Sequence, residues 1–236
     1  MRFRRFLLLL LGLILGLILY LRPWRLFSPR TRWVLEWLLR PQVHPEWRSR
    51  ALSRCNPDAP FLFPTDGFIG YLWDDSFRPG HRHQGIDIFG GELPGKTPVY
   101  AAYDGYLTRL PSWKSSLILR VPQDPLLPGR QIWLYYTHLA DREGNSFIHP
   151  DFPPGTRERF VQAGTLLGYQ GDYSGDPLNP VGVHLHFSIV LDDGNGNFRN
   201  ELDIRNTLDP SPYFGLPLNG QKNRDRIVIC NPSMEP

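Results

Sequence analysis

The stretch VHLHFSIV, residues 183–190, is the most informative part of this chain about its fold. It consists mainly of apolar residues, interrupted by His184 and His186. Side chains at positions i and i+2 of a strand face the same side of the sheet. We therefore expect a strand on which both imidazoles point one way, while Leu185 and Phe187 enter the core. A His-x-His pattern on a strand is typical of metal binding, although it is a moderate signal by itself.

A second fragment, HQGID, lies about a hundred residues earlier and runs from His83 to Asp87. The four-residue spacing would suit one face of a helix. The intervening glycine and the β-branched Ile86 and Ile88 instead favour a loop that enters a strand. Alternation along that strand places both isoleucines inward and Asp87 on the groove side. Taken alone, the fragment would be better explained as a solvated aspartate and a surface histidine.

Together the two fragments offer the ligand set of a catalytic metal site. Two imidazoles and one carboxylate supply three protein ligands and leave a fourth position open, as in catalytic zinc sites, whereas structural zinc is closed by four ligands. His81 could replace His83, but only His83 has the four-residue offset to Asp87. This pattern favours an enzyme, and specifically a hydrolase.

From Phe61 onward, the chain consists of short runs in which apolar and polar residues alternate, and the two histidine fragments lie among them. The chain has 24 prolines and 22 glycines, and no long segment with a helical period follows residue 61. This texture predicts an all-β fold, an antiparallel β-sandwich or open barrel. The expected strands are Gly67–Leu72, Gly85–Phe89, Val99–Ala102, Tyr106–Leu110, Ser116–Val121, Gln131–His138, Thr165–Gln170, His184–Val190 and Arg226–Cys230.

The N-terminal part of the chain differs from the rest in charge. Residues 1–54 hold eleven arginines and two acidic residues, whereas the other 182 residues carry 15 basic and 21 acidic side chains. This basic end contains the uncharged run FLLLLLGLILGLILYL, residues 6–21, which indicates a membrane as partner and not a nucleic acid. We expect an uncleaved transmembrane signal anchor, because no small-residue cleavage site follows the run. A cleaved signal peptide is the alternative.

The chain divides into four parts in this interpretation. Residues 1–40 comprise the basic N-terminus, the transmembrane helix and a short amphipathic helix, WVLEWLL, that would lie along the membrane face. Residues 41–60, rich in proline and arginine, would be a linker. Residues 61–215 would form the catalytic domain, and residues 216–236 a C-terminal tail.

The two cysteines, Cys55 and Cys230, stand near the edges of the expected domain. In an oxidising compartment a disulfide between them would tie the entry of the domain to its exit. Two unpaired, small apolar residues are the alternative. Both interpretations stay open, because the sequence gives no distance between the two sulfur atoms.

Further motifs accompany the two histidine fragments in a fixed order: GHRHQGIDI at 80–88, TPVYAA at 97–102, DG at 104–105, YTHL at 136–139, GTLLG at 164–168 and HLHF at 184–187. This ordered set resembles the lysostaphin/LytM-type zinc endopeptidases. Any one motif is weak, but the order is specific. The resemblance covers about residues 61–190, so the first 60 residues and the tail after about 215 lie outside it.

Carried over onto this chain, the resemblance implies that His83, Asp87 and His186 are the zinc ligands. It leaves His184 and His138 as active-site histidines that do not bind the metal. No His-Glu-x-x-His sequence occurs, so the helix-borne glutamate base of other zinc peptidases is absent. His184, on the strand face of His186, is placed to act as general base, and His138 to hold the oxyanion or orient the water. Which histidine is the base stays open.

The expected function is that of a membrane-anchored zinc endopeptidase. The resemblance implies peptide bonds in peptidoglycan stem or cross-bridge peptides as substrate. With the apolar run at 6–21 as anchor, we expect a single-pass protein of the bacterial cell membrane, and the chemistry that the resemblance implies places the catalytic domain outside the cytoplasm. One alternative is a zinc peptidase that acts on a secreted protein. Another is a non-catalytic module of the same fold that activates a cell-wall amidase, although the intact ligand set counts against it. We expect no nucleic-acid partner, and the sequence indicates no oligomeric state.

Overall fold

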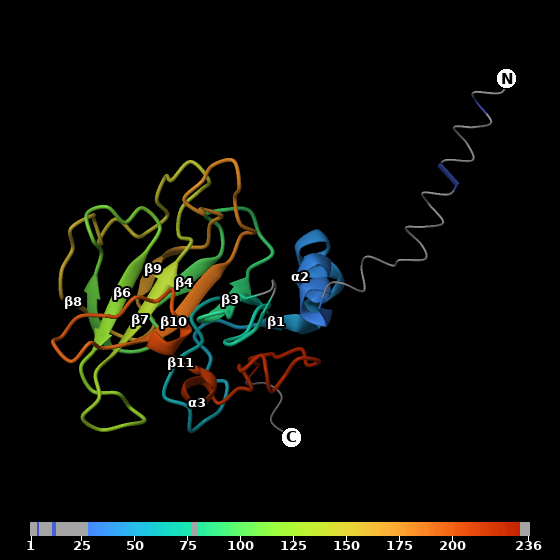
Figure 1. Cartoon of the computed structure of the whole chain (residues 1–236). Helices are drawn as coiled ribbons and strands as arrows, with labels where there is room; N and C mark the ends of the chain where they lie inside the picture. Colours follow the sequence, from blue (N-terminus) through green and yellow to red (C-terminus); the bar gives the residue numbers. More distant parts are fainter. Residues whose placement is uncertain (1–3, 5–10, 13–27, 77–79, 232–236) are drawn as a thin grey trace.

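The computed structural model describes residues 4, 11–12, 28–76 and 80–231. Within these residues, nine strands form one antiparallel sheet in the order β1-β2-β3-β10-β7-β6-β5-β8, with β11 paired to β10 (Figure 1). The strands of this sheet are β1 (Arg48–Ser49), β2 (Gly67–Ile69), β3 (Ile86–Phe89), β5 (Gly105–Thr108), β6 (Leu117–Val121), β7 (Ile132–Thr137), β8 (Arg159–Val161), β10 (Leu185–Leu191) and β11 (Thr207–Leu208).

A smaller sheet consists of β4 (Pro98–Tyr100) and β9 (Leu166–Tyr169). Val99 of β4 and Leu167 of β9 belong to the same buried cluster as Phe187 of β10, so the small sheet packs against the large one. The prediction of a mostly antiparallel β fold is therefore confirmed. The described helical segments are short: α2 (Pro29–Leu39), η2 (Pro41–Val43), η3 (Pro45–Trp47), η4 (Ile204–Asn206) and α3 (Ser211–Phe214).

The alternation predicted for the two histidine fragments is confirmed in the core. Leu185 and Phe187 of β10 are fully buried in the main cluster. Ile86 and Ile88 of β3 enter the same cluster from the neighbouring strand. Because side chains alternate along a strand, the polar residues between these apolar ones face the other side of the sheet.

Helix α2 begins at a clear sequence signal. The Ser28 hydroxyl accepts a hydrogen bond from the backbone N–H of Thr31 at 3.1 Å, and Pro29 occupies the first turn. A serine N-cap followed by proline is a common helix start, because both compensate for N–H groups that lack a partner inside the helix.

The apolar face of α2 packs against the protein itself. Trp37 is fully buried and Val34 nearly so, in a cluster with Phe68 of β2 and Phe89 of β3. In Figure 1, α2 lies beside β1 and β3 at one end of the large sheet. The sequence predicted that this amphipathic segment would lie along a membrane. The structure shows instead that Val34 and Trp37 pack against Phe68 and Phe89 of the domain, whereas the leucines of the helix remain exposed.

The predicted single-pass membrane anchor is not supported. Among the described residues, no helix has both the length and the apolar character needed to cross a bilayer. The longest of them, α2, has 11 residues, which at about 1.5 Å per residue covers only about half of a hydrocarbon core of roughly 30 Å. The apolar run at 6–21 lies outside the described residues, apart from Leu11 and Gly12.

Residues 41–60, expected to be a linker, contribute to the folded domain. Strand β1 pairs with β2, with Arg48 opposite Phe68. Farther along, Cys55 forms a disulfide with Cys230, and their Cα atoms lie 4.8 Å apart. The bridge considered from the sequence is therefore present, and it joins residues 175 positions apart in the chain.

The segment Arg226–Cys230 forms no strand, which corrects the prediction of a last strand there. The backbone of Cys230 instead donates to the Ser49 hydroxyl at 2.9 Å and accepts from the N–H of Arg50 at 3.1 Å. These contacts and the disulfide hold the segment beside β1 at its last residue. A strand requires a continuous ladder of backbone hydrogen bonds to a neighbouring strand, whereas the backbone–backbone hydrogen bond of this segment with Arg50 involves Cys230 alone.

Candidate metal centre

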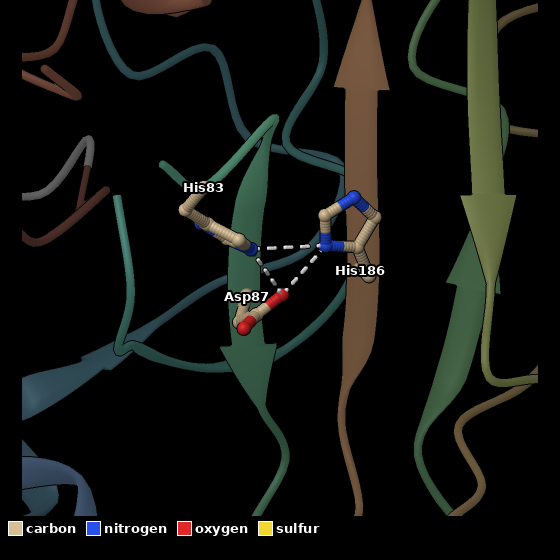
Figure 2. A group of neighbouring side chains, drawn as sticks. All are labelled: His83, Asp87 and His186. Carbon is tan, nitrogen blue, oxygen red and sulfur yellow. Dashed lines mark hydrogen bonds and ion pairs between the residues drawn. The ribbon is translucent and has the colours of Figure 1, made fainter. Parts of the chain in front are cut away.

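Two of the predicted metal ligands meet because β3 and β10 are neighbours in the sheet. Their antiparallel register places His186 directly opposite Asp87. Directly opposed side chains lie on the same face, with Cβ atoms about 4.5–5.5 Å apart. Figure 2 shows Asp87 and His186 pointing toward each other, while His83 reaches the same point from the loop before β3.

Backbone contacts hold His83 in this loop. Its N–H donates to the carbonyl of Asp75 at 2.8 Å, and its carbonyl accepts from the N–H of Asp74 at 2.8 Å. Arg82 makes a two-pronged ion pair with Asp74, at 2.5 and 2.7 Å. The ring Nδ1 of His83 lies 3.0 Å from the carbonyl of Leu72. Because a carbonyl only accepts, Nδ1 carries the proton, which leaves Nε2 as the nitrogen able to bind a metal together with Asp87 and His186.

The three donor atoms converge on one point. His83 Nε2 lies 3.1 Å from Asp87 Oδ1 and 3.1 Å from His186 Nδ1, and the last two atoms are 2.8 Å apart. In a tetrahedral zinc site with bonds of about 2.0–2.2 Å, donor atoms lie roughly 3.4 Å from one another. Imidazole nitrogen and carboxylate oxygen are both zinc donors. Spacing and chemistry therefore fit a zinc-like divalent ion after a small expansion of the group.

Burial and charge keep this group suited to a cation. Asp87 is only 7% exposed. Burial raises the pKa of its carboxyl, but the imidazoles of His83 and His184 lower it more, so the pKa lies well below its usual range. Asp87 is therefore ionised at neutral pH, as a metal ligand must be.

Glu201 is a site residue that the sequence analysis missed. Its Oε1 lies 2.8 Å from Nε2 of His186, the ring nitrogen that faces away from the other two donors. Burial lowers the pKa of His186, but Glu201 and Asp87 raise it to about 10. Without a metal the ring is therefore protonated at both nitrogens at neutral pH. A bound metal would displace the Nδ1 proton, and the carboxylate of Glu201, which accepts a hydrogen bond from Nε2–H, makes Nδ1 the metal-binding atom. The segment Asn200–Leu202 gives no motif or spacing from which this contact could be predicted.

His184 and His138 lie beside the donor group, with ring centroids 4.5 Å apart. In each ring Nδ1 faces a backbone carbonyl, that of Gly182 at 2.5 Å for His184 and that of Tyr173 at 2.6 Å for His138. Nδ1 is therefore the protonated nitrogen in both rings, and Nε2 is a proton acceptor. Nε2 of His184 lies 3.5 Å from Asp87 Oδ1.

His138 follows the end of β7 in an uncommon backbone conformation. Its φ is 70°, in the left-handed region. For a residue other than glycine this conformation costs on the order of 1–2 kcal/mol, and such residues cluster at functional sites. Burial lowers the pKa of His138, and the neighbouring His184 and His186 lower it further, to about 3. The ring is therefore neutral over the physiological pH range.

A cavity of about 600 Å³ brings all five predicted site residues together. We call His83, Asp87, His138, His184 and His186 the histidine wall. A second part of the lining, which we call the helix wall, consists of Val34, Leu35 and Leu38 of α2. The described lining residues include none from 41–60. The remaining ones are Tyr71, His81, Gln84, Phe89, Tyr135, Thr137, Ser174, Val181, Gly182, Glu201 and Leu202.

No protein-family model matches the chain, and no curated protein matches it. Solved structures do match. One is a candidate glycyl-glycine endopeptidase LytM from Ruminococcus gnavus, with 22% sequence identity, a TM-score of 0.40, and coverage of 68% of this chain and 61% of that chain. This chain therefore spans about three fifths of the length of that protein.

Two further solved structures are similar to this chain. The catalytic domain of a prophage-encoded M23 protein, EnpA, from Enterococcus faecalis has 20% identity, a TM-score of 0.37, and coverage of 62% of this chain and 92% of that domain. A candidate M23 peptidase from Pseudomonas aeruginosa has 20% identity, a TM-score of 0.37, and coverage of 71% of this chain and 54% of that chain.

Proposed function

We propose that this protein is a zinc-dependent endopeptidase that hydrolyses peptide bonds in peptidoglycan. The observation that carries the proposal is the convergence of three zinc donor atoms, within 3.1 Å of one another, beside two imidazoles. Three protein donors that face a cavity leave room for water and substrate, which distinguishes a hydrolytic zinc site from a structural one.

Each residue of the donor group has a definite part in this chemistry. A zinc ion held by His83, Asp87 and His186 would lower the pKa of water toward ~7 and polarise the scissile carbonyl. The ionised Asp87 compensates part of the positive charge at a buried position. Glu201 fixes the tautomer of His186, because its carboxylate accepts a hydrogen bond from Nε2–H and Nδ1 is then the nitrogen that binds the metal.

His184 and His138 carry the proton transfer in this proposal. Both rings are fixed by a carbonyl at Nδ1, so each presents Nε2 without having to rotate first. We assign to this pair the acceptance of a proton from the attacking water and its delivery to the leaving amine, a role that the absent glutamate base fills in other zinc peptidases.

The charges around the cavity support cleavage at an internal peptide bond. Among the described residues that line it there is no lysine or arginine. Recognition of a terminal carboxylate usually requires such a cation. Asp87 and Glu201 would moreover repel a carboxylate nearby. The LytM-type motifs support peptidoglycan stem or cross-bridge peptides as the substrate class.

The test is digestion of purified peptidoglycan by the full-length, zinc-loaded protein, with the products identified by mass spectrometry. We expect new amine termini at one kind of peptide bond, which disappear after chelation and in His184→Ala. The variant should still bind one zinc ion. His149→Ala, a change in a loop outside the cavity, is the matched control and should remain active.

Two outcomes would contradict the proposal in different ways. Intact peptidoglycan despite stoichiometric zinc would exclude the substrate and favour a zinc peptidase that acts on a protein. Intact peptidoglycan with no bound zinc would exclude the zinc enzyme and favour a non-catalytic module of this fold.

A further inference from the structure

The helix wall combines exposed apolar side chains with direct access to the candidate metal centre. Leu35 and Leu38 of α2 are 44% and 38% exposed. They stand three residues apart, a spacing that places both side chains on one face of a helix. Both line the same cavity as the histidine wall. A peptide that reaches the metal centre through this cavity therefore passes an apolar surface.

Helix α2 is firmly attached near its N-terminal end. Arg30 is 1% exposed, and its Nε lies 3.0 Å from a carboxylate oxygen of Asp75. A buried guanidinium requires such partners, because an unpaired charge inside a protein is strongly destabilising. The other two nitrogens of the guanidinium donate, at 2.7–3.0 Å, to the carbonyls of Gly70, Asn223 and Arg226.

The C-terminal half of α2 is attached next to the histidine wall. Nε1 of Trp37 donates to the carbonyl of Phe89 at 2.8 Å. The ring of Phe89 stacks on His184, with centroids 4.9 Å apart. The helix and a proposed catalytic histidine thus share one supporting residue, so the helix wall is a preformed surface at a fixed position beside the site.

Two glycines of the domain lie directly against side chains of α2. A Cβ at Gly182 would lie 3.2 Å from Cδ1 of Leu38, and one at Gly70 would lie 2.9 Å from Cγ2 of Val34. At both positions a larger residue would force the side chain of α2 to shift. The carbonyl of Gly182 also fixes the ring of His184. Leu38 therefore contacts the segment that positions this histidine.

We propose that Leu35 and Leu38 form an aliphatic subsite that selects the substrate residue next to the scissile bond. This inference rests on the proposed function. Burial of an aliphatic side chain against such a surface strengthens binding by roughly ten- to a hundredfold. Glycine has no side chain to bury there. The subsite therefore favours a peptide bond flanked by an aliphatic residue over a glycine–glycine bond.

Binding of peptide hydroxamates to the full-length, zinc-loaded protein tests this subsite. The hydroxamates carry a hydrogen, a methyl or an isobutyl group at the residue next to the zinc-binding group, and calorimetry gives their dissociation constants. For the unaltered protein we expect the isobutyl compound to bind at least about tenfold more tightly than the hydrogen compound. In Leu35→Ser/Leu38→Ser this ratio should fall to about two.

The control is Leu39→Ala, at a 74% exposed position of the same helix that is not part of the cavity lining. Its ratio should match that of the unaltered protein. The single variant Leu38→Ser should lower the ratio partly, and it replaces the double variant if the latter unfolds at a lower temperature.

The possible failures are distinguishable. An unchanged ratio in the serine variants, or no preference in the unaltered protein, would overturn the aliphatic subsite and leave the zinc peptidase intact. If no hydroxamate binds to zinc-loaded protein and no peptidoglycan is cut, the proposed function and the subsite both fall.

Discussion

The histidine wall and the helix wall face one cavity, but they depend on different kinds of interaction. The histidine wall consists of titratable groups, and hydrogen bonds of 2.5–3.0 Å to backbone carbonyls and to Glu201 fix the orientation of its imidazole rings. The helix wall consists of aliphatic side chains on a helix that apolar packing and one buried arginine hold in place. Hydrogen bonds and metal ligation are directional, whereas hydrophobic contact is not.

This difference determines which amino-acid substitutions each wall tolerates. A ligand atom must lie within a few tenths of an ångström of its position, so the histidine wall permits almost no substitution. An apolar wall requires only a surface of suitable size, so several residues fit at Leu35 or Leu38. We therefore expect substitutions in the histidine wall to abolish reactivity, and substitutions in the helix wall to alter stability and selectivity.

The largest effect is expected from His83→Ala. Removal of one of three donors should eliminate stoichiometric zinc and reduce peptidoglycan cleavage on the order of 10³-fold or more, equivalent to about 4 kcal/mol of transition-state stabilisation. Metal analysis and the initial cleavage rate measure both quantities, with His149→Ala as control. Full zinc content in His83→Ala would show that the donor triangle is not the metal centre.

Among single substitutions in α2, Trp37→Ala should lower the free energy of unfolding the most. Trp37 is completely buried between the helix and the sheet, and loss of such a side chain costs about 3–5 kcal/mol of unfolding free energy. Urea denaturation measures it. Leu39→Ala on the same helix should change stability by less than about 0.5 kcal/mol. If both variants were equally stable, α2 would not unfold together with the domain.

Glu201→Gln should weaken zinc binding without removing any ligand. Loss of the carboxylate that accepts the Nε2 proton of His186 should raise the zinc dissociation constant by about 10- to 100-fold. Competition with a chromogenic chelator measures this constant. Glu143→Gln, in an exposed turn, is a matched control and should bind zinc normally. Unchanged affinity in Glu201→Gln would mean that the contact at 2.8 Å does not orient the ring.

The smallest expected effect is the pH dependence of folding stability, which arises from a residue of the histidine wall and has no counterpart in the helix wall. The folded-state pKa of His138 is depressed to about 3, so between pH 3 and about 6.5 the unfolded chain binds more protons than the folded one. This contribution to stability is therefore complete above pH 6.5 and is lost as the pH falls toward 3. Zinc-free His138→Asn should lose less unfolding free energy than zinc-free unaltered protein between pH 7.5 and 4.5.

Asparagine suits this comparison because it tolerates the left-handed backbone at φ 70° and does not titrate. Urea denaturation at the two pH values measures the difference. Equal losses in the two proteins would contradict a neutral, buried His138.

Much of the histidine wall could be predicted from sequence because its chemistry restricts residue types. His184 and His186 stand two apart on a strand, and the period of two in a strand implies a common face. Asp87 alternates with two isoleucines, which fixes its direction in the same way. The roles of these residues as ligands and bases stay predictions, which zinc analysis and the cleavage rates of the variants decide.

Glu201 and the helix wall could not be predicted for a common reason. Glu201 reaches His186 through a tertiary contact of a polar loop. The apolar face of α2 fits a membrane surface and a protein surface equally well, so its pattern of leucines and tryptophans does not identify its partner. The basic, leucine-rich N-terminus favoured the membrane, whereas the structure places Val34 and Trp37 against Phe68 and Phe89.

The sequence by itself determined the antiparallel β character, the inward and outward faces of β3 and β10, and a set of three residues that could hold a metal ion. These follow from local periodicity and from the few side chains that can act as ligands. Only the tertiary structure decided that His186 lies opposite Asp87, that Cys55 reaches Cys230, and that α2 lines the cavity. Strand register, disulfide geometry and helix docking depend on contacts between distant segments, and no local pattern of residues specifies them.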